Sequence, residues 1–228
     1  MNILIVSNKK YSLKRMKYLT EELKINIYYI ENKADLKYEN LKKINPKYVF
    51  FPYWSYIIPK EVYQNFNCII FHMTDLPFGR GGSPLQNLIS RGIYSTKISA
   101  IQCEKEIDSG AIFLKKEMSL YGNAEEIYLR AYNIIEEMII EIIKEEIIPV
   151  KQSGEVVVFK RRTPEDSDIS LLDNLEKIYD YIRMLDAEGY PKAYIKNDKF
   201  KFEFERAALK NGYIKADVKI YQMEEKNE

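Results

Sequence analysis

The sequence contains one histidine, His72, and only two cysteines, Cys68 and Cys103. A single histidine and two separated cysteines do not make a typical zinc-ligand set, so we expect no metal site. Both cysteines lie in apolar runs without Cys-x-x-Cys spacing, which favours buried, reduced thiols over a disulfide or a redox motif. Any histidine chemistry in this chain depends on His72, the residue type that titrates nearest neutral pH.

An excess of charge of either sign is also absent, because 35 Lys and Arg residues balance 34 Asp and Glu residues. Nucleic-acid-binding domains usually carry a basic excess that neutralises phosphates, so the composition predicts no nucleic-acid partner. The most apolar candidate helix, residues 134–148, is interrupted by charged side chains and does not predict a membrane span. The N-terminus lacks a signal-peptide pattern, and we expect a cytoplasmic protein with no membrane partner.

What the sequence does contain, in its first half, is an alternation of strand and helix patterns. Apolar runs predict strands over residues 2–6, 25–30, 48–51 and 68–71. Helical periodicity covers residues 12–24 and 36–44, and a short helix is expected from Pro59. This alternation favours an α/β fold with a mainly parallel sheet, whose ligands bind at the carboxyl ends of the strands. His72 and Ser7 follow strands at such ends.

Further elements are expected along the rest of the chain. The patterns predict a helix over 83–91, strands over 96–103 and 111–115, and a long helix that begins at the Asn123–Glu126 capping box and ends before Pro149. Beyond Pro149 they predict short strands over 154–159, 193–196, 200–204 and 213–221, a helix over 174–185 and a frayed tail from 224. We therefore predict one α/β domain over residues 1–149. A small, mainly β appendage with one helix is expected over residues 150–228.

His72 and Asp108 are the residues most suited to acid–base chemistry. Each follows an apolar strand, so both could reach one cleft, and a carboxylate beside an imidazole fixes the tautomer of the ring. The spacing alone leaves a second interpretation open, because Asp108 before Ser109-Gly110 also suits an ordinary turn.

The stretch from His72 to Gly110 resembles the folate-dependent formyltransferases, which include glycinamide-ribonucleotide, methionyl-tRNA and sugar-nucleotide N-formyltransferases. The residues that carry this resemblance are His72, Leu76-Pro77, Arg80-Gly81, Pro84, Gly92, Thr96, Ser99 and Asp108-Ser109-Gly110. The resemblance implies a Rossmann-like domain that moves a formyl group from N10-formyltetrahydrofolate to an amine without a metal. It also implies that His72 and Asp108 are catalytic.

One position departs from the family pattern. The family asparagine, which with the histidine is thought to hold the formyl oxygen, falls on Ile70, which has no hydrogen-bond donor. Losing one oxyanion donor typically costs about 3 kcal/mol. Thr74 is our candidate for a substitute catalytic donor. A non-catalytic folate-binding module is the alternative that Ile70 favours.

The same resemblance predicts the residues that contact the folate. They lie in two segments, one after the third strand and one before Asp108, and comprise Trp54, Tyr56, Ile58, Cys103, Glu104 and Ile107. Core packing is an equally open interpretation of Trp54. Arg80, Gly81 and Gly82 could supply a cation and close backbone approach to the ligand, or simply form a tight loop.

For the acceptor, two basic or polar segments are candidates. Ser7, Asn8 and Lys9 could meet a phosphate at a helix N-terminus or form a solvated turn. Arg161 and Arg162 resemble a segment of sugar N-formyltransferases, while Thr163, Pro164 and Asp166 also suit a helix cap.

The size of the C-terminal region decides our prediction of the acceptor. Methionyl-tRNA formyltransferases are expected to carry a larger, basic C-terminal domain, so we predict a small-molecule acceptor, a nucleotide-linked amino sugar of glycan biosynthesis. A carrier-bound or tRNA-bound aminoacyl group is the alternative. The apolar appendage leaves a homodimer open.

Overall fold

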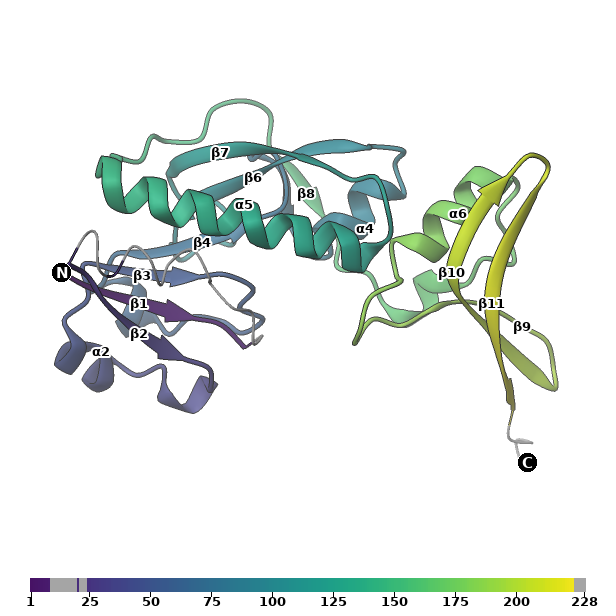
Figure 1. The fold of residues 1–228 in the computed structure, drawn as a ribbon, viewed down its shortest axis with the longest axis horizontal. Helices are drawn as coiled ribbons and strands as arrows, with labels where there is room; N and C mark the ends of the chain where they lie inside the picture. Colours follow the sequence, from purple (N-terminus) through teal and green to yellow (C-terminus); the bar gives the residue numbers. More distant parts are fainter. Residues whose placement is uncertain (9–19, 21–23, 224–228) are drawn as a thin grey trace. The chain divides into compact units, whose positions relative to one another are not determined.

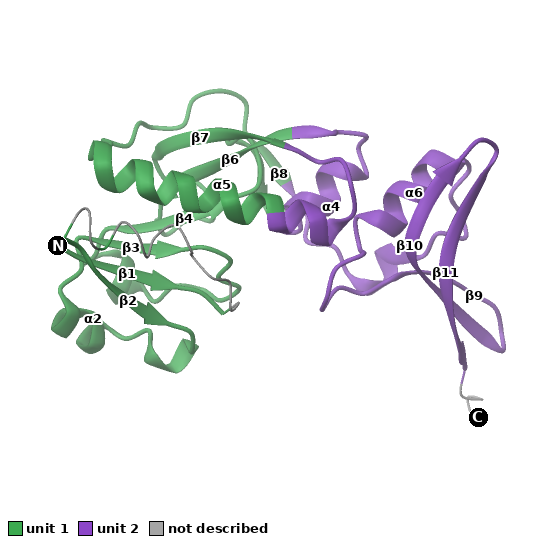
Figure 2. Ribbon diagram, in the orientation of Figure 1, with its two compact units in different colours: residues 1–81, 96–118, 130–158 green, residues 82–95, 119–129, 159–228 purple. Residues whose placement is uncertain are grey.

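The computed structural model describes residues 1–8, 20 and 24–223. The chain forms two compact units (Figure 2), each built from interleaved segments. Unit 1 comprises residues 1–81, 96–118 and 130–158, and unit 2 comprises residues 82–95, 119–129 and the chain from residue 159 onward. The predicted domain boundary between residues 149 and 150 stays a prediction.

A six-stranded sheet forms the centre of unit 1 (Figure 1), in the order β2-β1-β3-β4-β6-β7. The strands are β1 (Asn2–Val6), β2 (Asn26–Ile30), β3 (Tyr48–Phe51), β4 (Cys68–His72), β6 (Ser95–Gln102) and β7 (Ile112–Ser119). β1 pairs in parallel with β2 and β3, and β3 pairs in parallel with β4, whereas β6 runs antiparallel to β4. The predicted α/β fold with a mainly parallel sheet is therefore confirmed.

The helices α2 (Tyr38–Ile44), α3 (Lys60–Tyr63) and the long α5 (Ala124–Glu145) follow the sequence pattern, whereas the short η1 (Lys33–Asp35) was not predicted. Asn123 and Glu126 form the expected capping box, each side chain accepting the main-chain N–H of the other residue at 2.9 Å. The helix predicted over residues 12–24 falls almost entirely outside the described residues, as does the tail from residue 224.

One short strand was not predicted from the sequence. β5 (Phe78–Gly81) pairs with β8 (Val157–Phe159) in a separate two-stranded sheet, where we expected a glycine-rich loop. Two of its four residues are glycines, and glycine has a low strand propensity. The sequence pattern therefore does not predict a strand here, although tertiary contacts can hold one in place.

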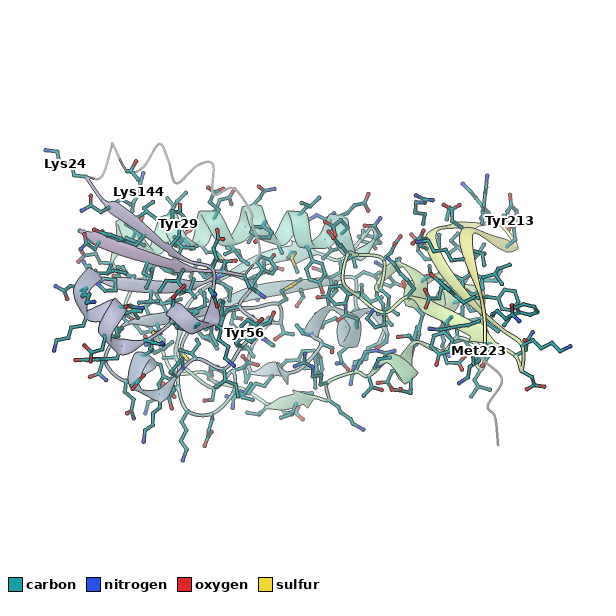
Figure 3. All side chains as sticks on the ribbon, turned by 90° about the horizontal axis from the view of Figure 1, so that it is seen from below. Lys24, Tyr29, Tyr56, Lys144, Tyr213 and Met223 are labelled. Carbon is teal, nitrogen blue, oxygen red and sulfur yellow. The ribbon has the colours of Figure 1, made fainter. Side chains whose placement is uncertain are left out.

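Unit 2 combines helices with an antiparallel sheet. Its elements are α4 (Pro84–Ile89), η2 (Pro164–Ser167), α6 (Leu175–Arg183) and the strands β9 (Ala193–Lys196), β10 (Phe200–Lys210) and β11 (Tyr213–Gln222) in the order β11-β10-β9. Tyr213 lies exposed where β11 begins (Figure 3). Among the described residues, no helix is both long and apolar enough to span a membrane.

Candidate active site

His72 occupies the carboxyl end of β4 and is 8% exposed. Its Nε2 atom lies 2.7 Å from the carbonyl oxygen of Gly79. A carbonyl only accepts hydrogen bonds, so Nε2 carries a proton and donates it. Gly79 has a φ of +81°, which lets the loop after β4 turn its carbonyl toward the ring at no steric cost. The loop therefore selects the orientation of the imidazole.

The second ring nitrogen faces Asp108. Nδ1 of His72 lies 3.4 Å from Oδ2 of Asp108, and both side chains are about nine-tenths buried. The main-chain N–H of Gly81 donates to the same Oδ2 atom at 2.9 Å. With Nε2–H already engaged, the contact at Nδ1 is attractive when that atom also carries a proton. The carboxylate of Asp108 is therefore held between Nδ1 of His72 and the main chain of Gly81.

The turn that brings Asp108 to His72 starts at the far end of β4. Because β6 is antiparallel to β4, Cys103 lies beside Cys68, and its N–H donates to the Cys68 carbonyl at 2.8 Å. The chain then turns back, with Asp108 at a φ of +54°. A Cβ on Gly110 would lie 1.8 Å from the carbonyl oxygen of Gln102, so only glycine lets this turn close. Asp108 is thus both a turn residue and the partner of His72.

Thr74 does not face an open site. Its side chain is fully buried, and its hydroxyl donates to the Gly79 carbonyl at 3.3 Å. Its own carbonyl accepts from the hydroxyl of Ser99 at 2.7 Å. Ile70, at the position of the family asparagine, packs against the apolar core. Thr74 supports the loop after β4, and we leave it out of the proposed oxyanion donors.

Three of the predicted folate contacts belong to the core of unit 1. Ile58 and Cys103 are buried members of the apolar cluster, and Trp54 packs against that cluster. The Trp54 ring contacts the rings of Phe51 and Tyr56 edge-on. Trp54 is therefore packed in the core, but its buried Nε1 atom has no hydrogen-bond partner among the described residues, and its contact with the folate stays a prediction. Any contact of Ile58 or Cys103 with a ligand would have to use main-chain atoms.

The remaining predicted folate contacts lie at the surface. Tyr56 is 45% exposed (Figure 3), and Glu104 is exposed as well. Apolar side chains are exposed in both segments, Ile57 at 89% and Ile107 at 74%. Exposed apolar side chains of this kind suit contact with a flat, partly apolar ligand.

Arg80 is engaged within the protein. Its Nε and Nη2 atoms donate to the side-chain oxygen of Gln152 at 3.1 and 2.7 Å. Gly81 has a φ of +102° and supplies its N–H to Asp108. Gly82 allows Arg161 to approach the main chain closely, because a Cβ on Gly82 would lie only 2.6 Å from the Cβ of Arg161. Of the three residues, Arg80 and Gly81 thus support Asp108.

The predicted acceptor contacts are divided between the units. In unit 1, the Ser7 N–H donates to the Ile30 carbonyl, and Asn8 lies at the limit of hydrogen bonding to Ser55, at 3.5 Å. Lys9 lies outside the described residues. In unit 2, Arg161 is exposed, whereas Arg162 donates to the Asp166 carbonyl and stacks over the Tyr181 ring at 5.0 Å.

The cap interpretation of the segment after Arg162 is realised. Thr163 and Asp166 form a capping box at the start of η2, with the Thr163 N–H donating to the Asp166 carboxylate at 2.7 Å. Arg162 therefore has a structural role, and Arg161 remains the exposed cation of the pair.

Neither thiol is suited to nucleophilic chemistry. Burial raises the pKa of Cys103 to about 11, and the negative charges of Asp108 and Glu104 act in the same direction. Burial also raises the pKa of Cys68. Both cysteines are therefore protonated at neutral pH. Within the described ranges there is no group of three or more His, Cys, Asp or Glu side chains that could hold a metal ion.

Sequence reasoning missed Gln152 and the main-chain groups of Gly79 and Gly81. Gln152 stands 44 positions from Asp108, in an irregular segment, and no local pattern marks it. The main-chain groups carry no sequence signal beyond the glycines themselves.

The fold and the His72–Asp108 pair define an α/β protein with a buried histidine–carboxylate pair at the end of a central strand. A family model described as the methionyl-tRNA formyltransferase C-terminal domain matches residues 164–221. The solved methionyl-tRNA formyltransferase from Clostridium thermocellum is 55% identical, covers 98% of this chain and all of its own, and has a TM-score of 0.92. The chain therefore belongs to the formyltransferase family.

Two further similarities are more limited. A methionyl-tRNA formyltransferase from Campylobacter lari is 30% identical over 63% of this chain and 50% of its own length. The chain spans about half the length of the curated relatives it matches. A sugar N-formyltransferase from Shewanella sp. covers 92% of this chain with a TM-score of 0.73, but at 17% identity it shares the fold alone.

These similarities overturn two predictions, the nucleotide-linked amino sugar of glycan biosynthesis and the absence of a nucleic-acid partner. The relatives of higher identity carry tRNA formyltransferase names. The prediction from the size of the C-terminal region was wrong, because a solved relative that aligns over all of its own length with 98% of this chain bears that name. The family C-terminal model likewise matches within the small appendage.

Proposed function

We propose that this chain transfers a formyl group from N10-formyltetrahydrofolate to the α-amino group of an aminoacyl residue, methionine, attached to tRNA. The observation that carries the proposal is the 3.4 Å contact between His72 and Asp108. It occurs in a chain that is 55% identical, over 98% of its length, to a protein named methionyl-tRNA formyltransferase.

The proposed reaction is a displacement at the formyl carbon. The amine nitrogen bonds to that carbon, the carbonyl oxygen becomes an oxyanion, and the bond from the carbon to N10 of the folate then breaks. The amine loses a proton and N10 gains one. Both contacts of Asp108 described above use Oδ2, so we assign Oδ1 as the acceptor of the amine proton. His72 holds the carboxylate in place through the contact at Nδ1.

Because Ile70 has no hydrogen-bond donor, the oxyanion is expected to be less well stabilised at this site than in the family pattern. The family asparagine is replaced by an apolar side chain in contact with the core, and Thr74 is buried and directed to Gly79. One missing donor corresponds to about 3 kcal/mol of transition-state stabilisation. We therefore expect a lower kcat than in relatives that retain the asparagine, with folate binding unaffected.

Each unit has exposed side chains suited to contact one of the two proposed substrates. In unit 1, Tyr56, Ile57 and Ile107 offer exposed apolar contacts to the folate. In unit 2, Lys160 and Arg161 are adjacent exposed cations that can approach the phosphates of a tRNA. A near-neutral chain can still bind RNA when its cations are locally clustered.

The proposal is tested by supplying N10-formyltetrahydrofolate with methionyl-tRNA and following tetrahydrofolate release and N-formylmethionyl-tRNA. The His72→Ala variant is the control, and uncharged tRNA is the negative substrate. Formylation that requires the aminoacyl group and is lost in the variant supports the proposal. Folate binding without any transfer would instead indicate a non-catalytic folate-binding module.

A further inference from the structure

The amide of Gln152 joins Asp108 to a neighbouring strand. Its Nε2 atom donates to the main-chain carbonyls of Asp108 and Gly110, both at 2.8 Å. Its oxygen accepts two hydrogen bonds from Arg80, at 3.1 and 2.7 Å. Both donor hydrogens and both lone pairs of the amide are therefore used. The orientation of the amide follows from its partners, because a guanidinium only donates and a carbonyl only accepts.

These bonds form a closed ring around Asp108. Gly81, which follows Arg80 in β5, donates its N–H to the Asp108 carboxylate. The side chain of Asp108 is thus fixed to β5 directly, and its main chain is fixed to β5 through Gln152 and Arg80. Asp108 has a φ of +54°, a conformation that residues with a side chain rarely adopt, so its turn depends on such external ties.

We propose that Gln152 is a positioning residue, which holds the turn so that the Asp108 carboxylate meets Nδ1 of His72. Gln152 acts through Asp108 and does not itself contact the reacting atoms. The effect of Gln152 on turnover rests on the proposed function, whereas its effect on the His72–Asp108 contact does not.

The single histidine allows a test that needs no activity. Selective ¹⁵N labelling of histidine gives the ring signals of His72 alone. Gln152→Glu keeps an oxygen that can accept from Arg80, but it places a second oxygen against the carbonyls of Asp108 and Gly110. The variant therefore breaks only the hydrogen bonds to those two carbonyls. At fixed pH, we expect its ring ¹⁵N shifts to move in the same direction as those of Asp108→Asn. In the Asp108→Asn background, Gln152→Glu should add no further change.

The kinetic test uses the same variants. Gln152→Glu is expected to lower kcat by about 10- to 100-fold through misplacement of Asp108. The KM values for the folate and for methionyl-tRNA should stay within about 2-fold, because uniform binding is not altered. The double variant with Asp108→Asn should be no slower than Asp108→Asn alone.

Gln86→Glu is the matched control, because Gln86 is a buried amide in unit 2 that donates to the Met184 carbonyl at 3.1 Å. It should lower thermal stability without changing the His72 signals or kcat. If Gln152→Glu does not fold, Arg80→Met can be used instead, because it removes the hydrogen bonds from Arg80 to Gln152. It should move the His72 ring signals in the same direction.

The outcomes separate the two proposals. Wild-type ring signals and wild-type kcat in a Gln152→Glu protein of lower stability would overturn the positioning role. Coupled ring signals in a protein that transfers no formyl group would contradict the proposed function and still support the positioning role.

Discussion

Among the described residues, both units contain a buried ion pair, and these two pairs differ in geometry. In unit 1, His72 and Asp108 lie 3.4 Å apart, and both contacts of the carboxylate use Oδ2. In unit 2, Nε of Arg183 lies 2.7 Å from Asp180, with the two residues 3% and 6% exposed. The unit 2 pair is short and enclosed, whereas the unit 1 pair is longer and leaves one carboxylate oxygen outside both contacts.

The partners of the unit 2 pair explain its role. Arg183 also donates to the carbonyls of Leu120 and Gly122, at 2.6 and 2.8 Å, and so joins α6 to the loop before α5. The Tyr94 hydroxyl donates to Asp180 at 2.9 Å, and this bond, together with burial, raises the pKa of Tyr94. Such a cluster holds a structure in place. Both contacts described for Asp108 use Oδ2, and this difference from the unit 2 pair fits the role that we propose for Oδ1.

The largest expected effect is the loss of catalysis in unit 1. Asp108→Asn removes the proposed acceptor of the amine proton, and His72→Ala removes the side chain that holds it. Because loss of a positioned general base lowers rates by about 10²- to 10⁴-fold, each variant should lower kcat to about that extent. Steady-state kinetics with methionyl-tRNA measures the effect, and a melting temperature near that of the wild type confirms that the variants fold. Near-normal turnover in either variant would remove that residue from the mechanism.

The next effect concerns the stability of unit 2. Arg183→Met leaves Asp180 buried without its cation, and breaking a buried pair in this way costs about 3–5 kcal/mol of unfolding free energy. Urea denaturation measures this loss, while kcat per folded molecule should be unchanged. Adding Asp180→Leu should recover much of the stability. A selective loss of kcat would instead place this cluster in the catalytic function.

Gly110→Ala tests whether the turn geometry matters for catalysis. The new Cβ would overlap the Gln102 carbonyl oxygen, so the turn must shift and carry Asp108 with it. A misplacement of about 1 Å can cost about 100-fold in rate, and kcat should fall by that order. Gly189→Ala is the comparison in unit 2, because no atom lies within 4 Å of a Cβ there, although its φ of +79° adds local strain. Equal kcat losses in both variants would contradict a local effect on Asp108.

The smallest effect is a pH-dependent one at the surface of unit 2. The main-chain N–H of Thr163 lowers the pKa of Asp166, and the charge of Arg162 acts in the same direction. A lowered folded-state pKa contributes stability above the unfolded value of about 3.9, and this contribution is lost as the pH falls through the folded value. Asp166→Ala should therefore cost no more than about 1 kcal/mol at pH 7.

The measurement is a pair of thermal melts. The difference between wild type and Asp166→Ala should be present at pH 7 and vanish near pH 2. A difference that persists in acid would assign the loss to helix propensity or packing instead of the ionised cap.

Local sequence patterns predicted most of the elements correctly. β1, β3 and β9 begin and end where apolar runs predicted them, and the Asn123–Glu126 capping box marks the start of α5. These features depend on neighbours within a few positions, where periodicity and capping chemistry are decisive. β5 was missed because its two glycines disfavour a strand that only its pairing with β8 sustains.

The candidate site was predictable only in part. The resemblance of the segment from His72 to Gly110 identified the acid–base pair, and the structure brings the two side chains together. The acceptor prediction was wrong, since composition and length do not report which substrate a short C-terminal region recognises. The direction of the Thr74 hydroxyl toward Gly79 could not be inferred either, because it depends on the positive φ of Gly79, five positions further along the chain.

The sequence by itself determined the α/β fold, the family motif and the fact that any histidine chemistry depends on His72. Those properties depend on residue types and short spacings, which every copy of the chain carries before it folds. Only the tertiary structure decided that Gln152, 44 positions away, holds the turn of Asp108 to Arg80. Hydrogen bonds between distant segments depend on distances and angles that arise when the sheet is assembled, and no local pattern encodes them.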